Sequence, residues 1–424
     1  MTGGDLEKPT GGSPGRAEKV VAGVSLNVLL LGFVSFFNDV SSEMITTVLP
    51  LFLISIGAGG VAIGVVVGLS NAVANVVKGL SGWLSDKFRR RKAFAFAGYA
   101  ISNASKPLMG VQTAWQGVLG LKVLDRVGKG VRVAPRDALI SHYSTIVQEQ
   151  LNETSSRSGR SFGVHRMMDT SGAILGSLLA SLLVLLVFGR NYGAVILWSL
   201  APGLLALVFM VFVKDVKLEE STPADLDGKS GKPRKDSIPR SLVKLLLALS
   251  VMEFASVDVA FLIVRANQMM PGEWVPFLYT GFNCVYAGFA VAAGRLGDKW
   301  GKQRTIVLGL VVLVAISAVM ALPLPFSTAS AAVATSAFVA FGVYMAIVDV
   351  GSKAFVSDVT GKDKKGRAYG LYYLFVGLLS IPESLLFGYL YEALGFTVAF
   401  TYAAVLLACC VVIFALSNFD QNAQ

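Results

Sequence analysis

The sequence is short of the residues that build a water-facing surface, a metal centre or a disulfide framework. Only 15% of its 424 residues are charged, whereas a soluble domain usually contains about 25%. His142 and His165 are the only histidines, and Cys284, Cys409 and Cys410 lie in apolar segments without paired spacing. These shortages exclude a disulfide-rich domain and indicate that no metal is bound.

Sequence motifs for nucleotide-driven transport and for enzymatic catalysis are also missing. No Gly-x-x-x-x-Gly-Lys-Ser/Thr run occurs, so a primary pump is not indicated. Two dispersed histidines and apolar cysteines offer no nucleophile–base pair, so we expect neither an enzyme nor a cofactor. Residues 1–21 are rich in Gly, Pro and charge and lack the short apolar core of a cleavable signal. They are predicted to form a disordered cytoplasmic tail, with insertion driven by the first span.

Apolar residues, by contrast, are abundant and come in long runs. They make up 54% of the chain, and the mean hydropathy is +0.64. About 20 such residues span the hydrocarbon core of a bilayer as a helix. The pattern predicts an all-α membrane protein with a lipid bilayer as its surroundings. Twelve spans are predicted near 24–55, 60–85, 92–111, 114–138, 162–188, 193–213, 241–266, 273–298, 304–323, 330–354, 366–390 and 395–417.

A polar segment divides these spans into two sets of six. Residues 214–240 are rich in Lys, Asp, Ser and Gly, which is typical of a flexible connector. We therefore predict an N-terminal six-helix bundle over 22–213, a cytoplasmic linker over 214–240 and a C-terminal six-helix bundle over 241–418.

The net charge of +10 lies in short loops and not along one amphipathic face. Basic residues cluster after the second, fourth, sixth, eighth and tenth spans, and the alternate connections are nearly bare of them. Cytoplasmic loops carry this excess of Lys and Arg. The distribution predicts an inner-membrane protein with both termini in the cytoplasm, and it excludes nucleic acid as a partner.

The two halves share a repeated loop sequence. Residues 82–92 read GWLSDKFRRRK, and residues 294–304 read GRLGDKWGKQR, about half the chain length further on. A second echo pairs 159–163 (GRSFG) with 366–370 (GRAYG). Repeated halves that face a site near the midplane are typical of alternating-access transporters.

This loop resembles the signature of the major facilitator superfamily, Gly-x-Leu-Ala-Asp-Arg-x-Gly-Arg-Arg/Lys, and it occurs in the two places where that family carries it. Arg126 with Gly130 resembles the family's second motif. The resemblance covers 24–417 and implies two pseudo-symmetric six-helix bundles, which we expect to form a monomer. Arg89 and Gln303 depart from the pattern. The resemblance implies gating roles for Gly82, Asp86, Arg90, Arg91, Gly294, Asp298 and Arg304; the alternative is that these loops only set topology.

Ionisable and amide side chains inside the predicted spans are candidates for the transport site, because such groups are costly in lipid. Each acid–base pair among them has a plain structural alternative as a buried salt bridge. Arg132 and Arg136 are assigned to the cytoplasmic interface, outside the site. The predicted cavity residues are Asp39, Glu43, Asn71, Asn75, Lys78, Lys106, Lys122, Arg126, His165, Arg166, Asp169, Glu253, Asp258 and Asn283.

Bases outnumber acids in the N-terminal half, which favours a small polar, anionic substrate. Asp39 and Glu43 lie one helical turn apart and are the predicted proton sites, with Arg126 as their partner. The function expected is proton-coupled secondary transport. Sodium coupling, proton-driven efflux of drugs or metabolites, and a non-transporting receptor with the same fold remain alternatives.

Overall fold

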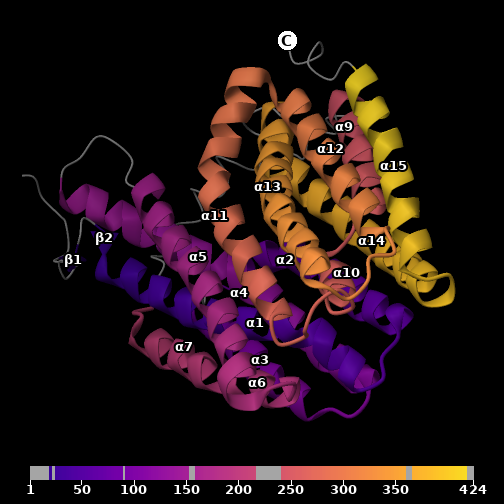
Figure 1. Cartoon of the computed structure of the whole chain (residues 1–424). Coiled ribbons are helices and arrows are strands. Elements are labelled where there is room, and N and C mark those ends of the chain that lie inside the picture. The colour runs from indigo at the N-terminus through magenta and orange to yellow at the C-terminus, as the bar shows by residue number, and fades with distance from the viewer. Residues whose placement is uncertain are drawn as a thin grey trace, which may run out of the picture.

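The computed structural model describes residues 19–21, 24–88, 91–151, 158–215, 240–359 and 365–417, and nearly all of them are helical (Figure 1). Most of the predicted tail and linker lies outside these residues. At the end of the predicted tail, Val20 and Val21 form a short strand that pairs with Val24 and Ser25; the disorder of the tail stays a prediction. The chain then enters its first helix, where the Ser25 hydroxyl accepts a hydrogen bond from the Asn27 amide at 3.0 Å.

The N-terminal half runs through strands β1 and β2 and a bundle of helices. Its elements are β1 (Val20–Val21), β2 (Val24–Ser25), α1 (Leu26–Ser55), α2 (Gly60–Phe88), α3 (Arg91–Leu108), η1 (Met109–Val111), α4 (Trp115–Gln150), α5 (Ser158–Leu183), η2 (Val184–Phe188), α6 (Tyr192–Trp198) and α7 (Leu200–Phe212).

The C-terminal half repeats this helical plan. Its elements are α9 (Arg240–Ala255), α10 (Val259–Ala266), α11 (Val275–Trp300), α12 (Lys302–Met320), α13 (Thr328–Val359), α14 (Lys365–Ala393) and α15 (Phe396–Leu416). Figure 1 shows the two bundles inclined to each other, with α2 and α14 at their junction.

Helix occupies every predicted span, and within the described residues ten helical stretches are long and apolar enough to cross a membrane. The other two predicted spans correspond to α3 and α4, whose charged residues lower their hydropathy, so the count of twelve stays a prediction. Two spans are broken, at Ser199 and between Ala255 and Val259. At the second break Asp258 caps α10 by accepting a hydrogen bond from the Ala260 amide at 2.8 Å.

We call the end at which α2 and α7 finish and α9 begins the basic end, because the Lys- and Arg-rich connections lie there. At the opposite end the two halves are in close contact. A Cβ on Gly64 of α2 would meet the Ser384 carbonyl of α14, and one on Gly60 would lie 2.5 Å from the Gly388 carbonyl. Such close backbone approach requires glycine and is a recurrent way of packing helices in membranes.

Polar contacts across the halves accompany this glycine seam. Arg190 Nε donates to Glu273 Oε1 at 2.8 Å, and the Ser181 and Thr280 hydroxyls lie 3.1 Å apart. Glu392 accepts a hydrogen bond from the Val61 amide at 2.9 Å. The halves are therefore joined at the opposite end, and the site described next lies nearer the basic end.

Candidate functional site

A polar cavity of about 400 Å³ lies where α1, α2, α4 and α5 face the C-terminal half. α4 contributes most of its charge, because residues spaced by three or four positions share one face of a helix. Glu253 of α9 is its contribution from the other half. The charged and amide side chains of the wall are five bases (Arg126, Lys129, Arg132, Arg136, Arg166), three acids (Asp39, Asp169, Glu253) and two asparagines (Asn71, Asn75).

Arg132 is the base with the most unsatisfied hydrogen-bonding capacity in this wall. Its side chain is only 3% exposed, and its Nε and Nη1 atoms make no hydrogen bond. The guanidinium lies over the ring of Tyr99, with 4.6 Å between the Arg132 Cζ atom and the ring centroid. The ring supplies a cation–π contact worth about 1–2 kcal/mol, but it takes up none of the N–H donors.

The neighbouring arginines lie at different distances from their carboxylate partners. Arg166 Nη1 lies 3.2 Å from Asp169 Oδ2, and Arg136 Nη2 lies 2.8 Å from Oδ1 of the adjacent Asp137. Arg126 Nε lies 3.9 Å from Asp125 Oδ2 and makes no hydrogen bond. The wall therefore combines arginines that are paired with carboxylates and N–H donors whose hydrogen bonds a bound oxyanion would complete.

Behind the cavity, α1, α3 and α4 hold a buried polar cluster. The Lys106 ammonium is 1% exposed and donates to Asn38 Oδ1 and Asn103 Oδ1, both at 3.1 Å. Asp125 accepts a hydrogen bond from the Ser102 hydroxyl at 2.5 Å. These bonds fix the position of Asn38, whose amide in turn donates to Asp39 Oδ1 at 3.1 Å.

Two predicted site residues of the N-terminal half bind the other half directly. Tyr279 of α11 donates to Glu43 Oε2 at 2.8 Å, and Asn71 Nδ2 donates to Asp258 Oδ2 at 3.5 Å. Lys122 and Asp258 line a smaller adjoining cavity of about 110 Å³. The smaller cavity shares Asn71 and Arg126 with the larger one.

The structure brings together about half of the predicted site residues at the main cavity. Those on its wall are Asp39, Asn71, Asn75, Arg126, Arg166, Asp169 and Glu253. Lys106 and His165 are buried within the N-terminal half, where His165 Nε2 lies 2.8 Å from the Ser35 hydroxyl, and Asn283 is buried in α11. Lys78 lies on α2, but its side chain is outside the described part of the chain.

The predicted gating loops are only partly described. Arg90 and the side chain of Asp86 fall outside the described residues, as do the surroundings of Gly82. Asp298 and Arg304 are exposed at the basic end, and Gly294 would place a Cβ 3.7 Å from Val350. The Arg91 Nε atom is buried without a hydrogen bond. The gating role therefore stays a prediction.

Arg132 and Arg136, which were assigned to the cytoplasmic interface and left out of the site, both line the cavity; their depth in the membrane stays a prediction. Lys129, which was not among the predicted cavity residues, lines it too. The sequence holds a usable signal, since Arg126, Lys129, Val133 and Arg136 follow helical spacing. Arg136 lies near the end of the predicted span 114–138, which favoured placing it outside the cavity. The helix α4 in fact continues to Gln150.

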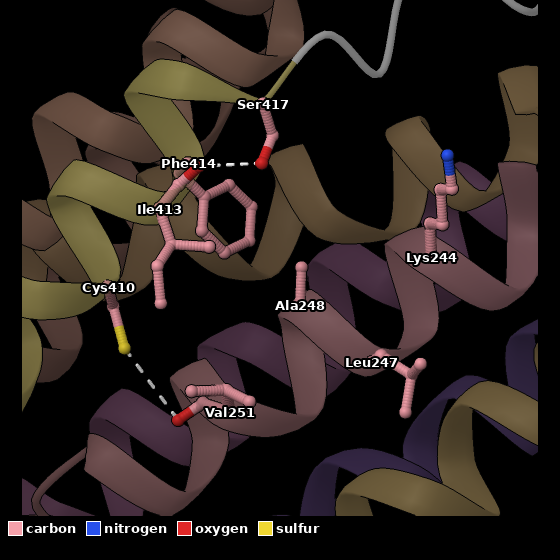
Figure 2. A pocket seen from close by; sticks show the side chains of 8 residues that line it. All are labelled: Lys244, Leu247, Ala248, Val251, Cys410, Ile413, Phe414 and Ser417. Atoms are coloured by element: carbon pink, nitrogen blue, oxygen red, sulfur yellow. Dashed lines mark hydrogen bonds between the residues drawn. The ribbon is translucent and has the colours of Figure 1, made fainter.

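A second cavity lies between α9 and α15, away from the charged wall. Figure 2 shows its apolar lining, including Leu247, Ile413 and Phe414. The Cys410 thiol donates to the Val251 carbonyl at 3.8 Å, and Lys244 lies at the rim. Because Leu247 and Val251 are about half exposed, this groove lies on the apolar outer face of the bundle and contains no predicted site residue.

Comparison with known proteins identifies the fold. The family model described as Major Facilitator Superfamily matches residues 31–381 and 245–422. This chain belongs to that superfamily. An uncharacterized MFS-type transporter of Methanocaldococcus jannaschii is 35% identical over 390 residues, which cover 90% of this chain and 92% of the relative. An uncharacterized protein of Mycobacterium tuberculosis is 26% identical over 396 residues, 92% of each chain.

Solved structures of this superfamily share the architecture. A nucleoside transporter superimposes with a TM-score of 0.76 at 12% identity and covers 92% of this chain and 99% of its own. A bacterial homolog of the human lysosomal transporter Spinster, described as inward-facing and occupied, gives 0.69 at 14% identity over 92% of this chain and 95% of its own. At these identities the likeness shows the fold and does not transfer a substrate.

Proposed function

We propose that this major facilitator protein carries a small polar anion across the membrane by proton-coupled alternating access. The observation that carries the anion assignment is Arg132, a nearly buried guanidinium whose Nε and Nη1 atoms have no hydrogen-bond partner among the described residues. An unpaired charge in a low-dielectric site is costly, so a ligand that completes its hydrogen bonds gains that energy on binding. Carboxylate, phosphate and sulfate oxygens have the matching geometry.

The state captured here fits the inward-facing half of such a cycle. Positive-inside topology puts the basic end in the cytoplasm, and the glycine seam closes the opposite end. Asp39 and Glu43 are the proposed proton sites. Asp39 lines the cavity, whereas Glu43 reaches across to Tyr279, so their protonation would affect substrate binding and the contact between the halves respectively.

Anion binding is tested with the purified full-length protein. Inorganic phosphate, sulfate, succinate and a neutral sugar are compared as additives in thermal unfolding, since a ligand of the folded state raises the melting temperature. At least one anion should raise it and the sugar should not. Arg132→Gln should abolish the shift. Lys244→Gln, which removes an exposed base at the rim of the apolar groove, should leave it intact; equal shifts in both variants would refute the assignment.

Transport and coupling are tested in proteoliposomes with the anion that binds. An imposed proton gradient should drive accumulation in the wild type, and Asp39→Asn should abolish the gradient-driven part while the protein still inserts. Accumulation driven by sodium alone would contradict proton coupling. Binding without flux under any gradient would favour a receptor over a transporter.

A further inference from the structure

Glu383 in α14 is a buried carboxyl group that the cavity wall does not include. Its residue is 5% exposed. One oxygen, Oε2, accepts a hydrogen bond from the Ser384 hydroxyl at 2.5 Å. The other oxygen, Oε1, is buried and has no hydrogen-bond partner in the part of the chain that the structure describes. The group is therefore only half satisfied, which is costly for a neutral carboxyl and far more so for a carboxylate.

The charges near Glu383 give a carboxylate no compensation. The charged side chains that act on it are Glu253 of α9 and Asp258 at the α9–α10 break, both acids, and Tyr344 and Tyr402 approach from α13 and α15. Within the described part of the chain, Glu383 makes no ion pair with a lysine or arginine. An ionised Glu383 would therefore add a buried negative charge beside two other acids while one of its own oxygens lacked a donor, and both effects favour the neutral carboxyl.

We propose that Glu383 is a proton-binding site of the C-terminal half, separate from Asp39 and Glu43. In this state the proton sits on the carboxyl group, so that no charge is buried. A proton rather than a metal ion is favoured, because no group of three acid, histidine or cysteine side chains among the described residues has the arrangement of a metal site.

Glu253 is the acid of this half that also faces the polar cavity. It lines the cavity wall, and its carboxyl group acts electrostatically on Glu383. No hydrogen bond joins the two carboxyl groups among the described residues, so a proton released by Glu383 would reach the cavity through intervening water. Each step of such a relay breaks one O–H bond on the donor as one forms on the acceptor.

The position of Glu383 links proton binding to movement of the halves. The next residue, Ser384, places its carbonyl against Gly64 of α2, and the Ser380 hydroxyl donates to the Gly68 carbonyl at 3.3 Å. Opening of the opposite end must separate α2 from α14 along this line. Water would then reach the region of Glu383, and the cost of ionising the group would fall. Proton release is therefore expected to accompany that opening.

The test is infrared difference spectroscopy of the full-length protein in lipid at neutral pH. The wild type should show the C=O stretching band of a protonated carboxyl, and Glu383→Gln should lose that band. Glu392→Gln, on the same helix but at an exposed carboxylate, and Asp39→Asn should both retain it. A band unchanged in Glu383→Gln would overturn the proposal, and so would its disappearance from the wild type on addition of sodium.

A second variant covers the case in which Glu383→Gln does not fold. Ser384→Ala removes the hydroxyl that donates to Oε2 and should shift the frequency of the same band; an unshifted band would overturn the assignment to Glu383. The outcome is independent of the anion proposal. Arg132→Gln should abolish anion binding and leave this band in place, so that failure of one proposal is distinguishable from failure of the other.

Discussion

Asp125 is the acid around which the bases behind the cavity are arranged. Lys106, Lys122 and Arg126 all act on its carboxylate, which is 5% exposed and bonded to Ser102. Removal of one partner from a buried charge cluster leaves the others uncompensated and costs about 3–5 kcal/mol. Asp125→Asn should therefore lower the free energy of unfolding by that amount, measured by denaturant or thermal unfolding in detergent.

The control for this substitution is Glu273→Gln. Glu273 also pairs with an arginine, Arg190, but the two side chains are 34% and 66% exposed, and exposed pairs contribute about 0–1 kcal/mol. Similar losses in the two variants would show that Asp125 does not hold the buried cluster together.

At the residue scale, the sequence predicted that charges would gather in the N-terminal half, but not which of them would meet. Asp39, Arg126 and Asp169 lie together at the cavity, and their role in transport stays a prediction. Lys106 instead donates its hydrogen bonds to two buried asparagines. That outcome depends on the rotation of α3 against α1, which helical spacing within one chain segment does not specify.

At the scale of elements, the seam between α2 and α14 depends on glycine. A valine at Gly64 would place its Cβ inside the contact distance of the Ser384 carbonyl, and overpacking of this kind costs about 1–3 kcal/mol. Gly64→Val should therefore shift the protein toward a state open at the opposite end. Spin labels at residues 55 and 394, in a background with the three cysteines replaced by alanine, should show a longer distance.

Gly120 of α4 is the control position, because a Cβ there would meet nothing within 4 Å. The same label distance should be unchanged in Gly120→Val. An unchanged distance in Gly64→Val as well would mean that the seam does not hold the two halves together.

Hydropathy predicted the elements well, because lipid forces each spanning backbone to satisfy its own hydrogen bonds as a helix. It did not predict the break between Ala255 and Val259 or the extension of α4 to Gln150. Both features depend on polar contacts. Asp258 caps α10 and also reaches Asn71 of the other half, a tertiary contact that no local pattern reveals.

At the scale of the whole molecule, the repeated halves are joined mainly at one end, and their charge is unequal. The polar cavity belongs mostly to the N-terminal half, with Glu253 as the contribution from the other half. Glu383 of the C-terminal half lies next to the seam with α2 through its neighbour Ser384. If Glu383 binds a proton as proposed, the substrate charge and this proton act on different halves, and both effects meet at the contact between them.

The exposed ion pair between Arg190 and Glu273 should make closure of the opposite end depend on pH. Its own backbone amide and then the Arg190 guanidinium lower the pKa of Glu273 below the ordinary 4.5. A lowered pKa in the closed state means that the pair stabilises closure above the ordinary pKa, and that this contribution is lost as pH falls through the lowered value.

Because exposed pairs contribute about 1 kcal/mol or less, the ratio of closed to open molecules should fall about fivefold or less on acidification, and added salt should reduce the effect. The distance between the labels at residues 55 and 394 reports this ratio. Arg190→Gln should remove the part of the pH dependence of this distance that arises from Glu273, so that only the change due to other groups remains. If wild type and Arg190→Gln respond identically to pH and to salt, the pair does not contribute to closure, and the glycine seam with its other polar contacts holds that end.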